Sequence, residues 1–106
     1  MTAAIFYRIV PTGTPTELYF TSYRAQGRIL RHPTAELLDR WAGISVYESE
    51  GQARHWARKR PYLGAFIAEL RINEGIRREQ TGRSGHYTLW GDPESLLRSM
   101  VRVVVV

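Results

Sequence analysis

The sequence has no cysteine and no long hydrophobic run among its 106 residues. Without cysteine, the fold can use neither disulfide bonds nor thiolate ligands for a metal ion. The run Val103–Val106 is far shorter than the roughly 20 apolar residues that span a bilayer. The first residues also lack the basic stretch and the apolar segment of a secretory signal. We therefore expect a cytoplasmic protein with no membrane partner.

Lysine is nearly absent as well, although the chain is strongly basic. Lys59 is the one lysine among 15 basic residues, which face ten acidic residues and leave a formal net charge of +5. Arginine keeps its charge and presents a planar fork of donors that matches phosphates and carboxylates. This balance predicts an anionic partner: a nucleic acid, a phosphorylated cofactor or an acidic protein surface. A genome whose base composition favours arginine codons would give the same arginine content without such a partner.

The sequence contains no motif for a metal site, a phosphate-binding loop or a nucleophile elbow. His32, His55 and His86 are far apart and lack the His-x3-His spacing of a metal site, so we expect no metal. The glycines at 82 and 85 lack the lysine and the helix start of a phosphate-binding loop. The candidate serine nucleophiles lie outside any nucleophile-elbow sequence: Ser45, Ser49 and Ser84.

The length and the 43% hydrophobic content predict a single domain over residues 1–106. Alternating apolar residues and turn signals predict strands at 4–10, 17–23, 43–47, 65–72, 76–80, 85–90 and 101–106. Helix periodicity and capping residues predict helices at 33–42, 50–60 and 92–100. The fold class is therefore α+β: a compact domain with a mixed or split β-sheet of about six strands and two to three short helices.

Some local patterns make sharper predictions. Segments 4–10 and 17–23 flank a Pro- and Gly-rich turn and should pair as a hairpin. Ser49 should cap the helix that follows it. In 65–72 the alternation directs Ile67 outward and its neighbours inward. The valine-rich segment 101–106 should be buried between other strands, because an exposed edge of this composition promotes aggregation.

Basic and aromatic residues define one functional hypothesis, a nucleic-acid-binding domain or small toxin-type ribonuclease. Arg54 and Arg58 lie one helical turn apart, and the late hairpin carries Arg77, Arg78 and Arg83. His55 or His86 could then act as the acid–base group. Tyrosines for stacking on bases are available at Tyr19, Tyr23, Tyr62 and Tyr87. The alternative is that these arginines form a solvated face without a specific partner.

A second hypothesis comes from the order of polar residues along the chain. Arg8 lies on the first strand, Ser45 and Tyr47 lie on a short strand that leads into the capped helix, and Glu69 and Glu79 come later. This order resembles the ADP-ribosyltransferase-like superfamily, compact split-sheet domains that bind nicotinamide dinucleotide (NAD).

The resemblance implies a role for each of these residues. Arg8 would bind the phosphates or ribose of NAD, and Ser45 or Tyr47 would hold the nicotinamide half. Tyr47, with Glu69 or Glu79, would supply the catalytic groups, the carboxylate orienting the nucleophile toward the anomeric carbon. The sequence lacks the Ser-Thr-Ser triplet found in that superfamily. The domain could therefore bind NAD without being an enzyme.

The segment from Gly85 to Pro93 is dense in aromatic and polar residues. With Gly43–Tyr47 it also resembles small bacterial proteins, a resemblance that implies no activity. We expect one wall of any pocket here, with His86 as a cofactor-binding residue. A third hypothesis is an interaction module that docks on an acidic protein. The sequence does not determine the oligomeric state.

Overall fold

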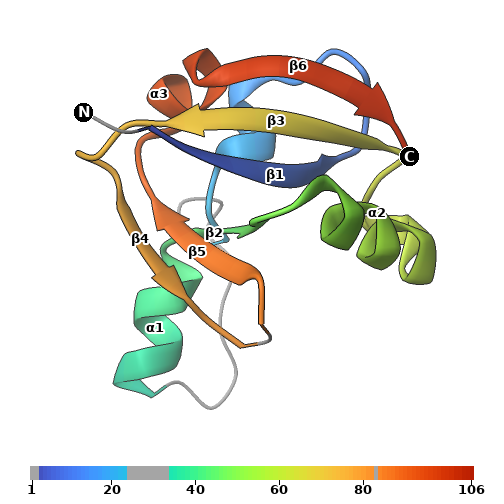
Figure 1. Ribbon diagram of the computed structural model, residues 1–106. Coiled ribbons are helices and arrows are strands. Elements are labelled where there is room, and N and C mark those ends of the chain that lie inside the picture. Colours follow the sequence, from blue (N-terminus) through green and yellow to red (C-terminus); the bar gives the residue numbers. More distant parts are fainter. Residues whose placement is uncertain (1–2, 24–33, 83) are drawn as a thin grey trace.

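The computed structural model describes residues 3–23, 34–82 and 84–106 (Figure 1). Its strands are β1 (Ala4–Val10), β2 (Ile44–Tyr47), β3 (Phe66–Ile72), β4 (Arg77–Gln80), β5 (His86–Trp90) and β6 (Met100–Val105). Its α-helices are α1 (Ala35–Trp41), α2 (Glu50–Lys59) and α3 (Pro93–Arg98). Two 3-10 helices, η1 (Glu17–Phe20) and η2 (Pro61–Leu63), complete the described elements. Pro33, where the first predicted helix begins, lies outside the described residues.

The strands form one antiparallel sheet in the order β4-β5-β2-β1-β3-β6. This α+β arrangement has no parallel pair among the described strands, so the mixed sheet considered above is not what forms. β1 pairs with β3 along its whole length, whereas β1 and β2 share one registered pair, Tyr7 and Tyr47. Figure 1 shows β1, β3 and β6 running together, while β5 and β4 turn away from them.

The main core lies on the sheet face that η1 and α3 cover. Phe20 from η1 and Leu96 from α3 are buried there against apolar residues of β1, β2, β3 and β5. The other face is covered in part by α2, which packs across β1, β2 and β3. Ile67 lies on this α2 face and is buried, so the prediction that it points outward was wrong. β3 thus buries Ala68, Leu70 and Ile72 on the core face and Ile67 on the α2 face.

The predicted strand at 17–23 was wrong, because its first four residues form the 3-10 helix η1. Both edges of β1 are already paired, one with β2 and the other with β3. No edge of β1 is left to form the predicted hairpin. The segment instead packs Phe20 into the core and leaves Leu18 exposed.

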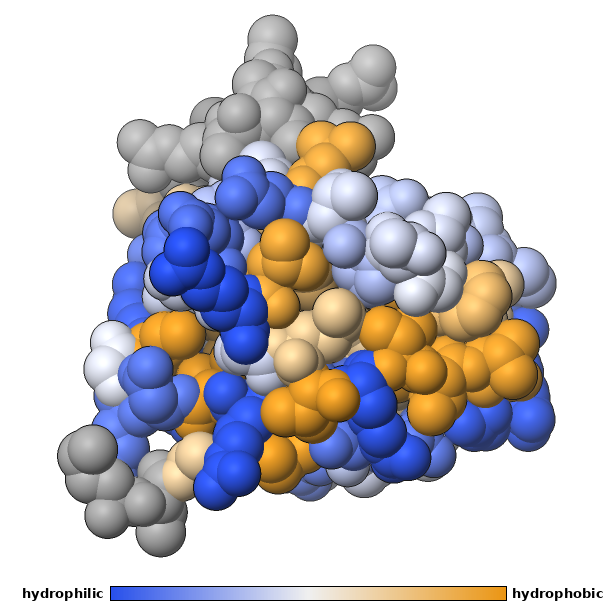
Figure 2. Space-filling view, turned by 90° about the horizontal axis from the view of Figure 1, so that it is seen from above, coloured by the Kyte–Doolittle hydropathy of each residue, from blue (hydrophilic) through white to orange (hydrophobic). Residues whose placement is uncertain are grey.

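The prediction that the valine-rich segment is buried between strands was also wrong. β6 is an edge strand, and 53% of Val101 and 67% of Val105 remain exposed. Seen from above, where β6 is the uppermost strand of Figure 1, the surface shows hydrophobic residues among hydrophilic ones (Figure 2). The edge is covered in part, since Arg54 Nη1 donates to the carbonyl oxygen of Val105 at 3.1 Å.

Several local predictions are confirmed. Ser49 caps α2, with its hydroxyl oxygen accepting from the backbone N–H of Gln52 at 3.2 Å. The helix predicted at 92–100 forms as α3, and Asp92 caps it by accepting from the backbone N–H of Glu94. β4 and β5 form the predicted hairpin. Among the described residues, no helix combines the length and the apolar character needed to cross a membrane.

We expect Leu89→Ala to lower the free energy of unfolding by about 2 to 5 kcal/mol, because the wild-type side chain is fully buried and the variant leaves a cavity. Urea denaturation followed by circular dichroism measures the change. Leu18→Ala is the matched control, since Leu18 is 63% exposed and its removal should change stability by less than about 0.5 kcal/mol. Equal effects of the two variants would contradict the described core.

Candidate functional site

A hollow of about 270 Å³ lies between α2 and the β4–β5 hairpin. Its lining residues come from β2, from the C-terminal end of α2 and from the hairpin: Tyr47, Trp56, Arg60, Gly82 and His86. Aromatic rings of this kind provide stacking surfaces, and arginine binds phosphate. None of the five is a carboxylate.

The sheet register sets where Tyr47 and His86 stand. Tyr47 is the registered partner of His86 on β5 and of Tyr7 on β1. The Tyr47 and His86 rings meet edge to face, with centroids 5.4 Å apart. The same register continues through β3 to β6 and puts one residue of each of five strands in a line on the α2 face. We call this line the polar row: Arg102, Glu69, Tyr7, Tyr47 and His86.

The one carboxylate of the polar row, Glu69, forms an ion pair with Arg102. Arg102 Nε donates to Glu69 at 3.0 Å, and Arg102 Nη2 donates to Glu50 at 3.0 Å. Glu50 also pairs with Arg54 at 3.3 Å. Burial raises the pKa of Tyr7, and the negative charge of Glu69 raises it further. Glu69, a predicted catalytic residue, is thus bound to Arg102 and does not line the hollow.

Arg8 connects β1 to two other segments. Its Nε donates to the carbonyl oxygen of Tyr19 and its Nη1 to that of Ser45, each at 2.7 Å. Burial lowers the pKa of Arg8 to about 10, and the neighbouring Tyr23 and Tyr47 act in the opposite direction. Arg8 forms no ion pair with any carboxylate of the described residues. Arg8, a predicted cofactor-binding residue, thus connects β1 to η1 and β2 and does not line the hollow.

The other predicted residues of the hairpin have structural partners. Arg77 binds Asp39 through two hydrogen bonds of 3.0 and 2.7 Å and stacks on Trp90 at 3.8 Å. Glu79, the second candidate carboxylate, lies 3.4 Å from Arg77. Arg77 lowers the pKa of Asp39, chiefly through these hydrogen bonds. Arg77 thus connects β4 to α1, Glu79 pairs with Arg77 on the same strand, and neither residue lines the hollow.

The predicted nucleic-acid-binding arginines do not form one surface. Arg78 donates to the carbonyl oxygens of Ile76 and Asn73, and Arg83 lies outside the described residues. α2, which carries Arg54 and Arg58, lies on the side of the molecule away from the first residues of β4, Arg77 and Arg78 (Figure 1).

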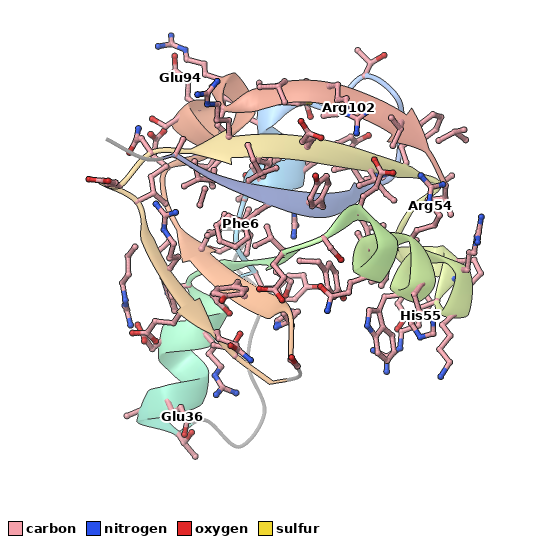
Figure 3. All side chains as sticks on the ribbon, in the orientation of Figure 1. Phe6, Glu36, Arg54, His55, Glu94 and Arg102 are labelled. Atoms are coloured by element: carbon pink, nitrogen blue, oxygen red, sulfur yellow. The ribbon has the colours of Figure 1, made fainter. Side chains whose placement is uncertain are left out.

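A second hollow, of about 470 Å³, lies along α2 alone. Its lining is basic: Gly51, Arg54, His55, Arg58 and Lys59. In Figure 3, Arg54 lies beside the C-terminal end of β6, whereas His55 points away from the sheet. Arg54 is paired with Glu50, but Arg58 and Lys59 form no ion pair within the part of the chain that the structure describes.

Sequence reasoning missed Trp56 and Arg60 as site residues. Trp56 is half-buried, and the Arg60 guanidinium lies 5.3 Å from its ring. The two residues are four positions apart and therefore share a helix face. This i, i+4 spacing of an aromatic residue and an arginine was the signal in the sequence that could have identified them as residues of one site.

A close contact between α2 and the hairpin keeps the two walls of the hollow together. Gln52 Nε2 donates to the carbonyl oxygen of Ser84 at 3.4 Å, and Gly85 adopts φ = 81° beside it. A Cβ atom on Gly85 would lie 2.0 Å from Gln52 Nε2. The backbone conformation favours glycine here, and a side chain at this position would also displace the end of the Gln52 side chain.

We expect Gly85→Ala to lower the free energy of unfolding by at least about 1 to 3 kcal/mol, because alanine is strained at this φ and displaces Gln52. Thermal denaturation measures the effect. Gly51→Ala is the control: it lies in α2 with open space around it and should be neutral or stabilising by up to about 1 kcal/mol. A neutral Gly85→Ala variant would contradict the close contact.

The first hollow can bind a flat ring and an anionic group, and it offers an imidazole but no carboxylate. Within the described residues, no three His, Asp or Glu side chains lie close enough to hold a metal ion. Comparison of the chain with known protein families, curated proteins and solved structures finds no match to any of them.

Proposed function

We propose that the chain is an ADP-ribosyltransferase-like domain that binds a nicotinamide dinucleotide in the first hollow. The observation that carries the proposal is the lining of this hollow, which combines two aromatic rings, an arginine and a histidine. Its volume of about 270 Å³ is near the lower end of the range for small-ligand sites. Such a space suits one half of a dinucleotide, with the rest lying across the adjacent surface.

Each lining residue has a role that its chemistry supports. Tyr47 or Trp56 would stack on a nucleobase or the nicotinamide ring. Arg60, which forms no ion pair among the described residues, would bind phosphate. The resemblance assigns the phosphates or ribose of the dinucleotide to Arg8, which has no carboxylate partner among the described residues but which lies outside the lining of the hollow.

The form of the sheet also supports the proposal. The resemblance implies a split sheet with Arg8 and Tyr47 on the walls of the binding site. β1-β3-β6 and β2-β5-β4 meet at the single registered pair of Tyr7 and Tyr47. Arg8 binds the carbonyl oxygen of Ser45 on β2 next to this pair. The two residues that the resemblance singles out thus adjoin one junction.

The carboxylates favour a binding domain over a transferase. Glu69 is held by Arg102 and Glu79 by Arg77. A carboxylate that orients a nucleophile has to reach the anomeric carbon of the ligand. With both glutamates outside the lining of the hollow, we propose that NAD binding is the function of the domain.

We expect Arg60→Ala to weaken NAD binding by about tenfold or more, because it removes a charge-assisted contact with phosphate. Isothermal titration calorimetry measures the Kd. Arg71→Ala is the matched control, because it removes the same charge from an exposed residue of β3 outside the hollow. Arg8→Ala is a less direct test because it also breaks two bonds to the backbone. Absence of NAD binding to the wild-type protein would refute the proposal.

The second hollow favours a second candidate function, nucleic-acid binding. Its lining is basic and contains no carboxylate, and Arg58 and Lys59 have no internal ion pair among the described residues. Phosphates of a single strand would bind along this side of α2. Docking of an acidic protein on the same helix is the remaining alternative.

We expect the double variant Arg58→Ala/Lys59→Ala to weaken binding of a labelled single-stranded RNA. The slope of log K against log salt should become shallower by about 0.7 for each phosphate that the variant no longer neutralises. Fluorescence anisotropy over a salt series measures both quantities. Arg40→Ala/Arg98→Ala removes the same charge from two residues that already have carboxylate partners. An equal effect of both double variants would mean that net charge, and not α2, attracts the RNA.

A further inference from the structure

The His86 ring has a defined orientation and a defined tautomer. Its Nδ1 lies 2.7 Å from the carbonyl oxygen of Thr81. A carbonyl oxygen can only accept a hydrogen bond, so Nδ1 carries the proton of the neutral imidazole and donates it. The Thr81 hydroxyl lies 3.2 Å from the same nitrogen and 2.7 Å from the Thr88 hydroxyl. These contacts hold the ring against the hairpin turn.

The tautomer determines what His86 offers to a ligand. When Nδ1 is the donor, Nε2 of the neutral ring is an acceptor. His86 lines the first hollow, and Nε2 has no hydrogen-bond partner among the described residues. The other polar side chains of the lining can all donate: the Tyr47 hydroxyl, the Trp56 indole N–H and the Arg60 guanidinium. His86 Nε2 is therefore the one side-chain group of the lining that only accepts.

We propose that His86 makes the hollow selective for a ring that carries a primary carboxamide over the same ring with a carboxylate. This inference rests on the proposed function, NAD binding in the first hollow. The Tyr47 and His86 rings lie 5.4 Å apart at an interplanar angle of 73°, so a nicotinamide ring stacked on Tyr47 would lie beside His86. The carboxamide N–H2 donates to Nε2, whereas a carboxylate would direct lone pairs against a lone pair.

General electrostatics would produce the opposite preference. The acid analogue of NAD, nicotinic acid adenine dinucleotide, carries one more negative charge. The chain has a formal net charge of +5, and Arg60 lines the hollow. Charge alone therefore favours the acid analogue. If NAD binds more tightly than its acid analogue, the site therefore contains a specific hydrogen-bond acceptor for the carboxamide.

The experiment compares the Kd of NAD with that of the acid analogue by isothermal titration calorimetry at about pH 8, where histidine is ordinarily neutral. The wild-type protein should bind NAD more tightly by about tenfold or more. His86→Gln should keep much of this preference, because its side-chain oxygen can accept near the position of Nε2. His86→Phe should lose the preference or invert it. Tyr62→Phe is the control at an aromatic residue that is 80% exposed and outside the lining, and it should leave the preference unchanged.

Each result has a distinct meaning. No binding of NAD to the wild-type protein refutes the proposed function and, with it, this inference. Binding of both dinucleotides with equal affinity, or tighter binding of the acid, overturns the inference and leaves NAD binding intact. A preference for the amide that persists in a folded His86→Phe protein also overturns it. Thermal denaturation establishes that each variant is folded, and the wild-type ratio tests the inference even if His86→Phe is not.

Discussion

The structure depends on one narrow connection, the pairing of β1 with β2 at Tyr7 and Tyr47. Three strands lie on each side of this pair, so it joins β1-β3-β6 to β2-β5-β4. Arg8 strengthens the connection by donating to the backbone of both η1 and β2. α2 packs across the same junction. The connection also brings Tyr47, the end of α2 and the β4–β5 hairpin together around the first hollow.

The charged residues divide into two groups with different roles. Several arginines have carboxylate partners within the fold, including Arg77 with Asp39 and Arg102 with Glu69. These exposed pairs orient β4, α1 and β6, although each contributes little to stability. The second group has no carboxylate partner among the described residues and includes Arg8, Arg58 and Arg60. Arg58 and Arg60 lie at the C-terminal end of α2 and Arg8 at the β1–β2 junction, whereas Arg71 and Arg78, which also lack an ion pair among the described residues, lie on β3 and β4.

Prediction from the sequence succeeded where the signal is local. The caps of α2 and α3, the strand around Leu70 and the β4–β5 hairpin all follow from residues a few positions apart. It failed at 17–23, because a strand-like pattern cannot show that both edges of β1 are already paired. It also failed at β6, where composition alone does not reveal which strand stays at the edge.

By itself, the sequence determined the α+β class, most element boundaries, the positive charge and the candidate residues Arg8, Tyr47 and His86. Only the tertiary structure decided which of these residues meet. The strand order places Tyr47 beside His86 and allows Glu69 to form an ion pair with Arg102. The packing of α2 brings Trp56 and Arg60 into the lining of the hollow. The reason is physical: strand pairing and helix packing join residues that are distant in the chain, and no local propensity encodes those contacts.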